Sequence, residues 1–134
     1  NLSVFGTAIN SPLFLPSIVR DAVIKNKVDM YVTPDYSKDY VFVDDVAKLA
    51  IRITKSSKHS IYNIASGKNV SAKEIASILQ EKSGCSIDWH KCSNTDKFPL
   101  TDISLIGDEF SFEPKLVEDL LGDMLTSFKK ELLS

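Results

Sequence analysis

Apolar side chains recur at the three- and four-residue spacing of helices in several stretches of the chain. This spacing predicts helices over residues 16–26, from 44 to between 55 and 58, over 71–83 and from 114 onward, with a short helical turn starting within 102–105. The third helix has the strongest local signals, because Ser71 and Glu74 form a capping box and Gly84 suits a left-handed C-terminal cap. Near the second helix start, Asp44 is expected to cap free amides and Asp45 to face the positive end of the helix dipole.

Short runs of β-branched and aromatic residues predict strands over 28–32, 40–43, 60–65 and 86–90. The first two flank the turn-forming segment 33–37. Residues 1–6 are a further short apolar stretch, which we expect to be a strand cut from a longer protein. Strands alternating with helices, without repeats, predict an α/β layer arrangement in one domain over residues 1–134.

The composition fits this prediction and excludes several classes of protein. Hydrophobic residues make up 43% of the 134 residues and charged residues 25%, as in ordinary globular domains. With a net charge of -2 and dispersed basic residues, the chain has no electrostatic footprint for nucleic acid. No apolar run approaches the roughly 20 residues that cross a bilayer, so we expect a cytoplasmic protein with no membrane partner.

Several ordered segments resemble one enzyme family. They are FLP (14–16), KDYVFVDDVA (38–47), IYNIASG (61–67), VSAKEIA (70–76) and FPLTDIS (98–104). Their order and spacing are similar to those of the NAD-dependent epimerase/dehydratase family, extended short-chain dehydrogenases that act on nucleotide sugars. The resemblance covers nearly the whole chain.

The resemblance implies a Rossmann-type α/β fold, of which this chain is the C-terminal, substrate-binding part. One or two of its elements would belong to the Rossmann sheet, and the N-terminal half that holds NAD or NADP would be missing. The five glycines are too far apart for a phosphate-binding loop, and no tyrosine is followed four residues later by lysine. We therefore expect no catalytic and no cofactor-binding residue here, and little turnover by the chain alone.

The same resemblance implies a set of residues that bind a nucleotide-diphosphate sugar. Lys38 stands where the family has an arginine that neutralises the diphosphate, although an ordinary surface lysine is an equal interpretation. Asp96 is similar to an aspartate that binds the ribose, but Ser93 stands where that loop has an arginine. Lys91 or Lys97 could partly substitute for the lost guanidinium.

Four apolar residues complete the predicted substrate-binding set, namely Phe14, Leu15, Met30 and Val32. In the family the corresponding backbone and strand border the nucleotide, whereas residue type alone favours simple core packing. No metal site is expected, because Cys85, His90 and Cys92 make a poor zinc site without a fourth ligand.

Two other functions stay open. One is a non-catalytic binding module of the same fold, which the serine at position 93 suggests, and the other is an extended short-chain reductase acting on a non-nucleotide substrate. A homodimer is also possible, through strand edges such as 61–65 that the truncation exposes.

Overall fold

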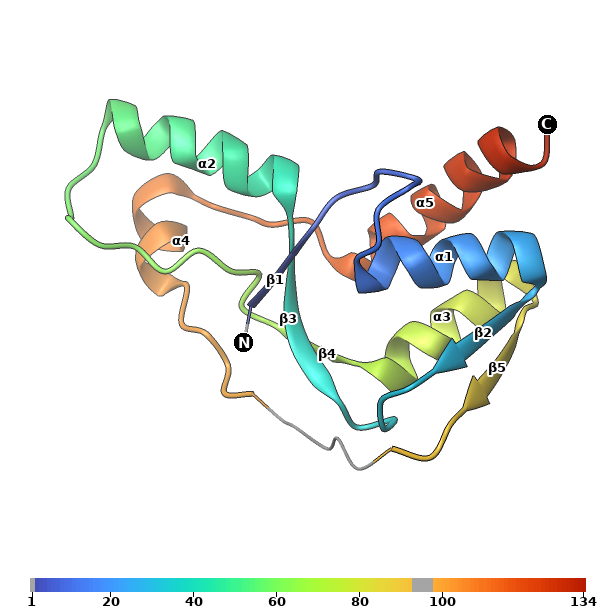
Figure 1. The fold of residues 1–134 in the computed structure, drawn as a ribbon. Helices are drawn as coiled ribbons and strands as arrows, with labels where there is room; N and C mark the ends of the chain where they lie inside the picture. Colours follow the sequence, from blue (N-terminus) through green and yellow to red (C-terminus); the bar gives the residue numbers. More distant parts are fainter. Residues whose placement is uncertain (1, 93–97) are drawn as a thin grey trace.

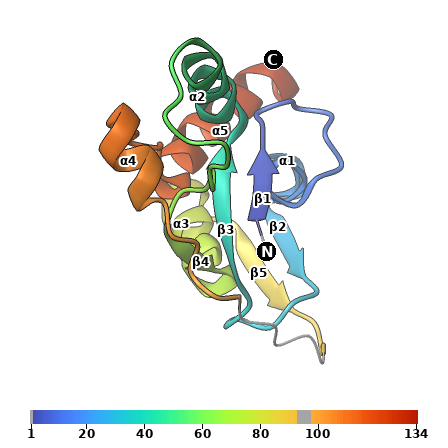
Figure 2. The ribbon, with the colours of Figure 1, turned by 90° about the vertical axis from the view of Figure 1, so that its left-hand side faces the viewer.

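The computed structural model describes residues 2–92 and 98–134, which form an α/β fold with two small sheets (Figure 1). In the first sheet, β1 (Leu2–Phe5) pairs in parallel with β3 (Ser37–Phe42), and β3 pairs antiparallel with β4 (Asn69–Ser71). Figure 2 shows these three strands side by side, with β3 in the middle. In the second sheet, β2 (Lys27–Met30) and β5 (Ser86–Trp89) run parallel.

Five helices surround the sheets among the described residues. They are α1 (Phe14–Lys25), α2 (Val43–Lys55), α3 (Ala72–Ser83), α4 (Ser104–Phe110) and α5 (Val117–Leu132). Figure 1 shows α1 and α3 beside the second sheet, with α5 packed against these two helices, while α2 and α4 lie together on the other side. None of these helices combines the length and apolar character needed to cross a membrane.

The apolar residues form two separate clusters. The main core joins α1, α3 and α5 to both sheets, and its fully buried members include Val19, Ile75 and Leu121. The second cluster is smaller and lies between α2 and α4, around Leu49 and Ile106. The predicted apolar face of the closing helix is confirmed, because six of its residues are buried.

The local signals at α3 behave as the sequence predicts. The Ser71 hydroxyl accepts a hydrogen bond from the Glu74 amide at 3.1 Å, and the Glu74 carboxylate accepts one from the Ser71 amide at 2.8 Å. Gly84 has a φ of 72°, and its amide donates to the Gln80 carbonyl at 2.9 Å. This capping fixes both ends of the helix.

The predicted strand over 60–65 is wrong, because these residues form no regular structure. Ile61 is 79% exposed, and the segment pairs with no strand among the described residues. A β-rich composition becomes a strand only where a partner strand supplies the hydrogen bonds. The short strand β4, which the sequence did not predict, instead takes the antiparallel place beside β3.

The predicted cap of α2 is also wrong. Phe42 occupies the N-cap position and no side chain caps the helix. Asp44 is exposed in the first turn, and the Asp45 carboxylate accepts a hydrogen bond from the Lys115 amide at 2.9 Å. Both carboxylates still lie at the positive end of the helix dipole, so the electrostatic part of the prediction agrees with the structure.

Candidate functional site

A small pocket lies between the start of α1, the loop that joins β2 to β3, and β3 itself. Its volume is about 150 Å³, and its lining residues are Phe14, Val32, Tyr36, Lys38 and Tyr40. Lys38 and Tyr40 belong to β3, where residues two apart point to the same face. The pocket therefore joins residues from three separate elements.

Aromatic rings form the walls of this pocket around one cation. The Phe14 and Tyr40 rings stack with centroids 6.5 Å apart, and the Lys38 ammonium lies 5.3 Å from the centroid of the Tyr36 ring. A cation over an aromatic face is stabilised by the ring quadrupole, which directs the Lys38 side chain. Apolar walls beside one positive charge suit a ligand with a flat or apolar part and an anionic group.

The turn that carries Tyr36 is attached to α3 by backbone hydrogen bonds. The Tyr36 amide donates to the Thr33 carbonyl at 3.0 Å and closes the turn. The amides of Ala72 and Lys73, in the first turn of α3, donate to the carbonyls of Tyr36 and Pro34 at 2.8 and 3.0 Å. Because these amides have no partner within the helix, the turn and the helix start satisfy each other.

Burial raises the pKa of the Tyr40 hydroxyl well above its ordinary value, and neighbouring Tyr36 adds to the shift. The hydroxyl therefore stays protonated near neutral pH. Tyr40 can donate a hydrogen bond but does not act as a base in this environment.

A larger hollow of about 500 Å³ shares Phe14 and Val32 with the first pocket. Its wall includes Asp29 and Tyr31, and Tyr31 is 67% exposed. The Tyr31 ring stacks on the His90 ring with centroids 4.6 Å apart. The two hollows are neighbours, because Phe14 and Val32 line both of them.

The predicted substrate residues have different positions in the structure. Phe14, Val32 and Lys38 come together in the pocket. Leu15 and Met30 are 1% and 0% exposed within the main core, so the core-packing interpretation describes these two side chains. Asp96 and Ser93 lie outside the described residues.

Sequence reasoning missed Tyr31, Tyr36 and Tyr40 as site residues. Tyr40 lies in the motif that carries the family resemblance, and its two-residue spacing from Lys38 was a usable signal. Tyr36 and Tyr31 had no such signal, because a turn and the start of a loop carry them.

The motif residue Asp39 has a structural role. Its side chain is 2% exposed, and its carboxylate accepts hydrogen bonds from the amides of Ser66 and Gly67 at 2.8 and 2.9 Å. Gly67 has a φ of 79°, and a Cβ there would lie 2.9 Å from the Ile103 side chain. Two segments of the family resemblance, 38–47 and 61–67, therefore meet through a buried carboxylate and a tight glycine turn.

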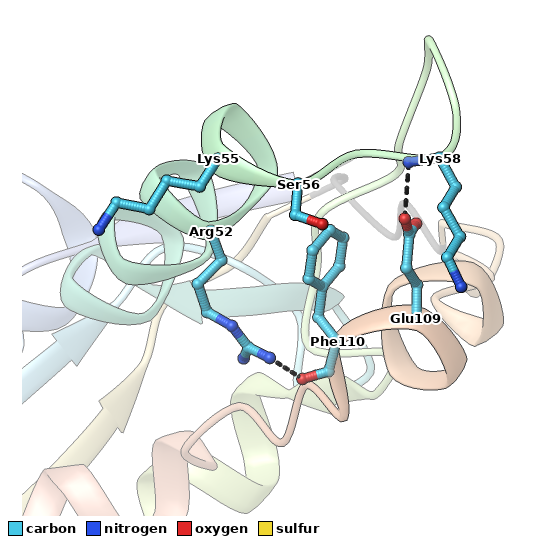
Figure 3. A pocket seen from close by; sticks show the side chains of 6 residues that line it. All are labelled: Arg52, Lys55, Ser56, Lys58, Glu109 and Phe110. Atoms are coloured by element: carbon cyan, nitrogen blue, oxygen red, sulfur yellow. Dashed lines mark hydrogen bonds between the residues drawn. The ribbon is translucent and has the colours of Figure 1, made fainter.

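Another hollow, of about 450 Å³, lies between the end of α2 and α4 (Figure 3). The Arg52 guanidinium donates to the Phe110 carbonyl, and the Lys58 amide donates to the Glu109 carboxylate at 2.7 Å. Burial raises the pKa of Glu109, but hydrogen bonds from the Tyr62 hydroxyl and the Lys58 amide outweigh it and hold the pKa below its ordinary value. These contacts hold α2 against α4, and none of the predicted substrate residues that the structure describes lines this hollow.

No family model matches the chain, and no curated protein matches its sequence. Solved structures do share its fold. RMD from Pseudomonas aeruginosa, complexed with NADPH, matches with a TM-score of 0.80 and 15% identity over 96% of this chain and 46% of that chain. The UDP-glucose 4-epimerase of Thermotoga maritima, with UDP-glucose, matches with a TM-score of 0.79 and 20% identity over 98% and 46% of the two chains.

The UDP-N-acetylglucosamine 4-epimerase of Methanobrevibacter ruminantium M1, in complex with UDP-N-acetylmuramic acid, has 25% identity and a TM-score of 0.75. That match covers 97% of this chain and 46% of the epimerase. This chain thus spans a little under half the length of the structures that it resembles. Its α/β fold is that of part of the NAD-dependent epimerase/dehydratase structures of the extended short-chain dehydrogenase type.

Proposed function

We propose that this chain is the nucleotide-sugar-binding portion of an NAD(P)-dependent epimerase or dehydratase. The observation that carries the proposal is the pocket in which Lys38 lies among three aromatic rings and Val32. The pocket contains three of the residues to which the sequence resemblance assigns substrate contacts, and the fold matches part of known sugar-nucleotide enzymes.

In this proposal Lys38 neutralises part of the diphosphate, as a point charge without the two-pronged geometry of arginine. Phe14 and Val32 pack against the apolar faces of the nucleotide, and the larger hollow beside them receives the rest of the ligand. Tyr31 offers an exposed ring for stacking at the wall of that hollow. The ribose contact of Asp96 remains a prediction.

We assign no catalytic step to residues of this chain. An epimerase or dehydratase of this type oxidises the sugar transiently, and NAD or NADP supplies the hydride acceptor. The sequence contains neither a glycine-rich phosphate loop nor the Tyr-x-x-x-Lys pair. Cofactor binding and proton transfer are therefore assigned to a separate cofactor-binding half, and the chain alone is expected to bind substrate without turnover.

The test is calorimetric titration of the chain with UDP-glucose, GDP-mannose and NAD. We expect one nucleotide sugar to bind at one equivalent and NAD not to bind. Lys38→Ala should weaken nucleotide-sugar binding about tenfold or more, since a charged hydrogen bond contributes roughly 1.5–3 kcal/mol. Lys38→Arg should retain binding.

Lys130→Ala is the matched control, because it removes an exposed lysine from the last turn of α5 that lines neither of the two hollows. Its affinity should equal that of the unmodified chain. If neither nucleotide sugar binds below about 10 mM, or if Lys38→Ala binds as tightly as the control, the proposal is wrong. Binding of an uncharged aromatic compound instead would favour the reductase alternative.

A further inference from the structure

Strand pairing brings together three side chains that the sequence keeps far apart. Asp29 of β2 and Asp88 of β5 are direct register partners in the second sheet (Figure 1), so their side chains lie next to each other on one face. His90 follows two residues after Asp88, and its amide continues the pairing by donating to the Met30 carbonyl at 2.9 Å. Potential ligand atoms of Asp29, Asp88 and His90 all lie within 4.8 Å of one another.

The two carboxylates place like charges on paired positions of the sheet. Like charges on directly paired residues destabilise a sheet. The Lys27 ammonium offsets them here, at 2.9 Å from the Asp88 carboxylate and 3.6 Å from that of Asp29. Its side chain is 47% exposed and flexible, so another cation can replace it at small cost.

The imidazole is held with one nitrogen directed at this group. The His90 Nε2 lies 2.8 Å from an Asp29 carboxylate oxygen, and the ring stacks on Tyr31 with an interplanar angle of 14°. A fixed ring orientation is what a metal-binding histidine needs from its surroundings. Asp29 also borders the 500 Å³ hollow, which leaves room for water molecules in the remaining coordination positions.

We propose that Asp29, Asp88 and His90 form an exchangeable site for a divalent transition-metal ion, with Zn²⁺ as the best fit. One imidazole nitrogen and two carboxylate oxygens suit Zn²⁺, whereas Mg²⁺ and Ca²⁺ prefer oxygen ligands only. Binding displaces the Lys27 ammonium from the two carboxylates and needs His90 in its neutral form. This site does not depend on the proposed nucleotide-sugar function.

The proposed site is not the combination of Cys85, His90 and Cys92, which makes a poor zinc site because it lacks a fourth ligand. Cys85 is 4% exposed within the main core, where its thiol packs among apolar side chains. In the proposed site, His90 binds the ion together with the carboxylates of Asp29 and Asp88, and no cysteine thiolate takes part. Only the parallel pairing of β2 with β5 makes this combination available.

The experiment is calorimetric titration of the chain with ZnCl₂ in a non-chelating buffer at neutral pH. We expect one saturable site, with affinity weakened about tenfold or more in His90→Ala and in Asp88→Asn. Lys27→Met should bind Zn²⁺ more tightly than the unmodified chain, because the competing ammonium is gone. A role of these residues in folding alone would not produce this increase.

His59→Ala is the matched control, since His59 is an exposed histidine outside the cluster, and it should bind Zn²⁺ unchanged. Cys92→Ser should also retain binding, and the Co²⁺ complex should lack a sulfur-to-cobalt charge-transfer band. Circular dichroism verifies that each variant is folded. The proposal is overturned by the absence of saturable binding below about 1 mM, or by binding that survives His90→Ala and is lost in Cys92→Ser.

Discussion

At the scale of single residues, Asp39 shows how a motif residue can be structural. Its buried carboxylate accepts hydrogen bonds from the amides of Ser66 and Gly67. A buried amide without an acceptor costs free energy comparable to its desolvation. The turn at Gly67 therefore depends on a charge located 28 residues earlier in the chain.

Asp39→Asn should lower the free energy of unfolding by roughly 2–3 kcal/mol, because the amide group of Asn accepts at only one of its two polar atoms. Urea unfolding followed by circular dichroism measures this change. Asp108→Asn is the control, since Asp108 is an exposed aspartate of α4, and its effect should stay within about 0.5 kcal/mol. Equal effects of the two substitutions would contradict the role of Asp39.

At the scale of elements, the start of α3 links a helix to the turn beside the pocket. The capping box satisfies the Glu74 and Ser71 amides, while Ala72 and Lys73 donate to the turn that carries Tyr36. The helix start is thus held by its own side chains and by a distant turn together.

Ser71→Ala should reduce the free energy of unfolding by about 1 kcal/mol, the usual cost of a lost serine cap. Chemical denaturation of the unmodified chain and of Ser71→Ala measures this difference in the free energy of unfolding. Ser57→Ala, in the exposed segment after α2, removes a hydroxyl that caps no helix and should leave stability almost unchanged. If the Ser71 cap contributed nothing to stability, Ser71→Ala and Ser57→Ala would unfold at the same denaturant concentration.

At the scale of the whole molecule, the two apolar clusters differ in size and in the helices that they hold. The main core includes buried residues of α1, α3 and α5, whereas α2 contributes only Leu49 as a fully buried residue. Helices with few buried contacts open more easily than the rest of a domain. The amides of α2 and α4 should therefore exchange hydrogen faster than those of α3 and α5.

Ile106→Ala should accelerate exchange in α2 and α4 and lower stability by roughly 2–5 kcal/mol, since Ile106 is fully buried in the second cluster. Leu121→Ala, in the main core, is the counterpart and should accelerate exchange in α1, α3 and α5 as well. Hydrogen exchange followed by mass spectrometry distinguishes the two patterns. Identical patterns would show that the clusters open as one unit.

Local sequence signals determined most of the helices and their ends. The capping box at Ser71, the glycine at 84 and the apolar face of the last helix act within a few residues, so their outcome was predictable. The α/β class followed from the alternation of helices and strands. The same reasoning failed at the Asp44 cap, because an N-cap depends on backbone angles that the flanking strand sets.

Tertiary structure decided everything that depends on pairing between distant segments. Residues 60–65 have the composition of a strand but pair with no strand among the described residues, whereas Asn69–Ser71 form β4 because they pair with β3. Of the six predicted substrate residues, packing brought Phe14, Val32 and Lys38 together and buried Leu15 and Met30. Asp29 and Asp88 became neighbours only through the register of two parallel strands, since hydrogen bonds over that sequence separation leave no local pattern.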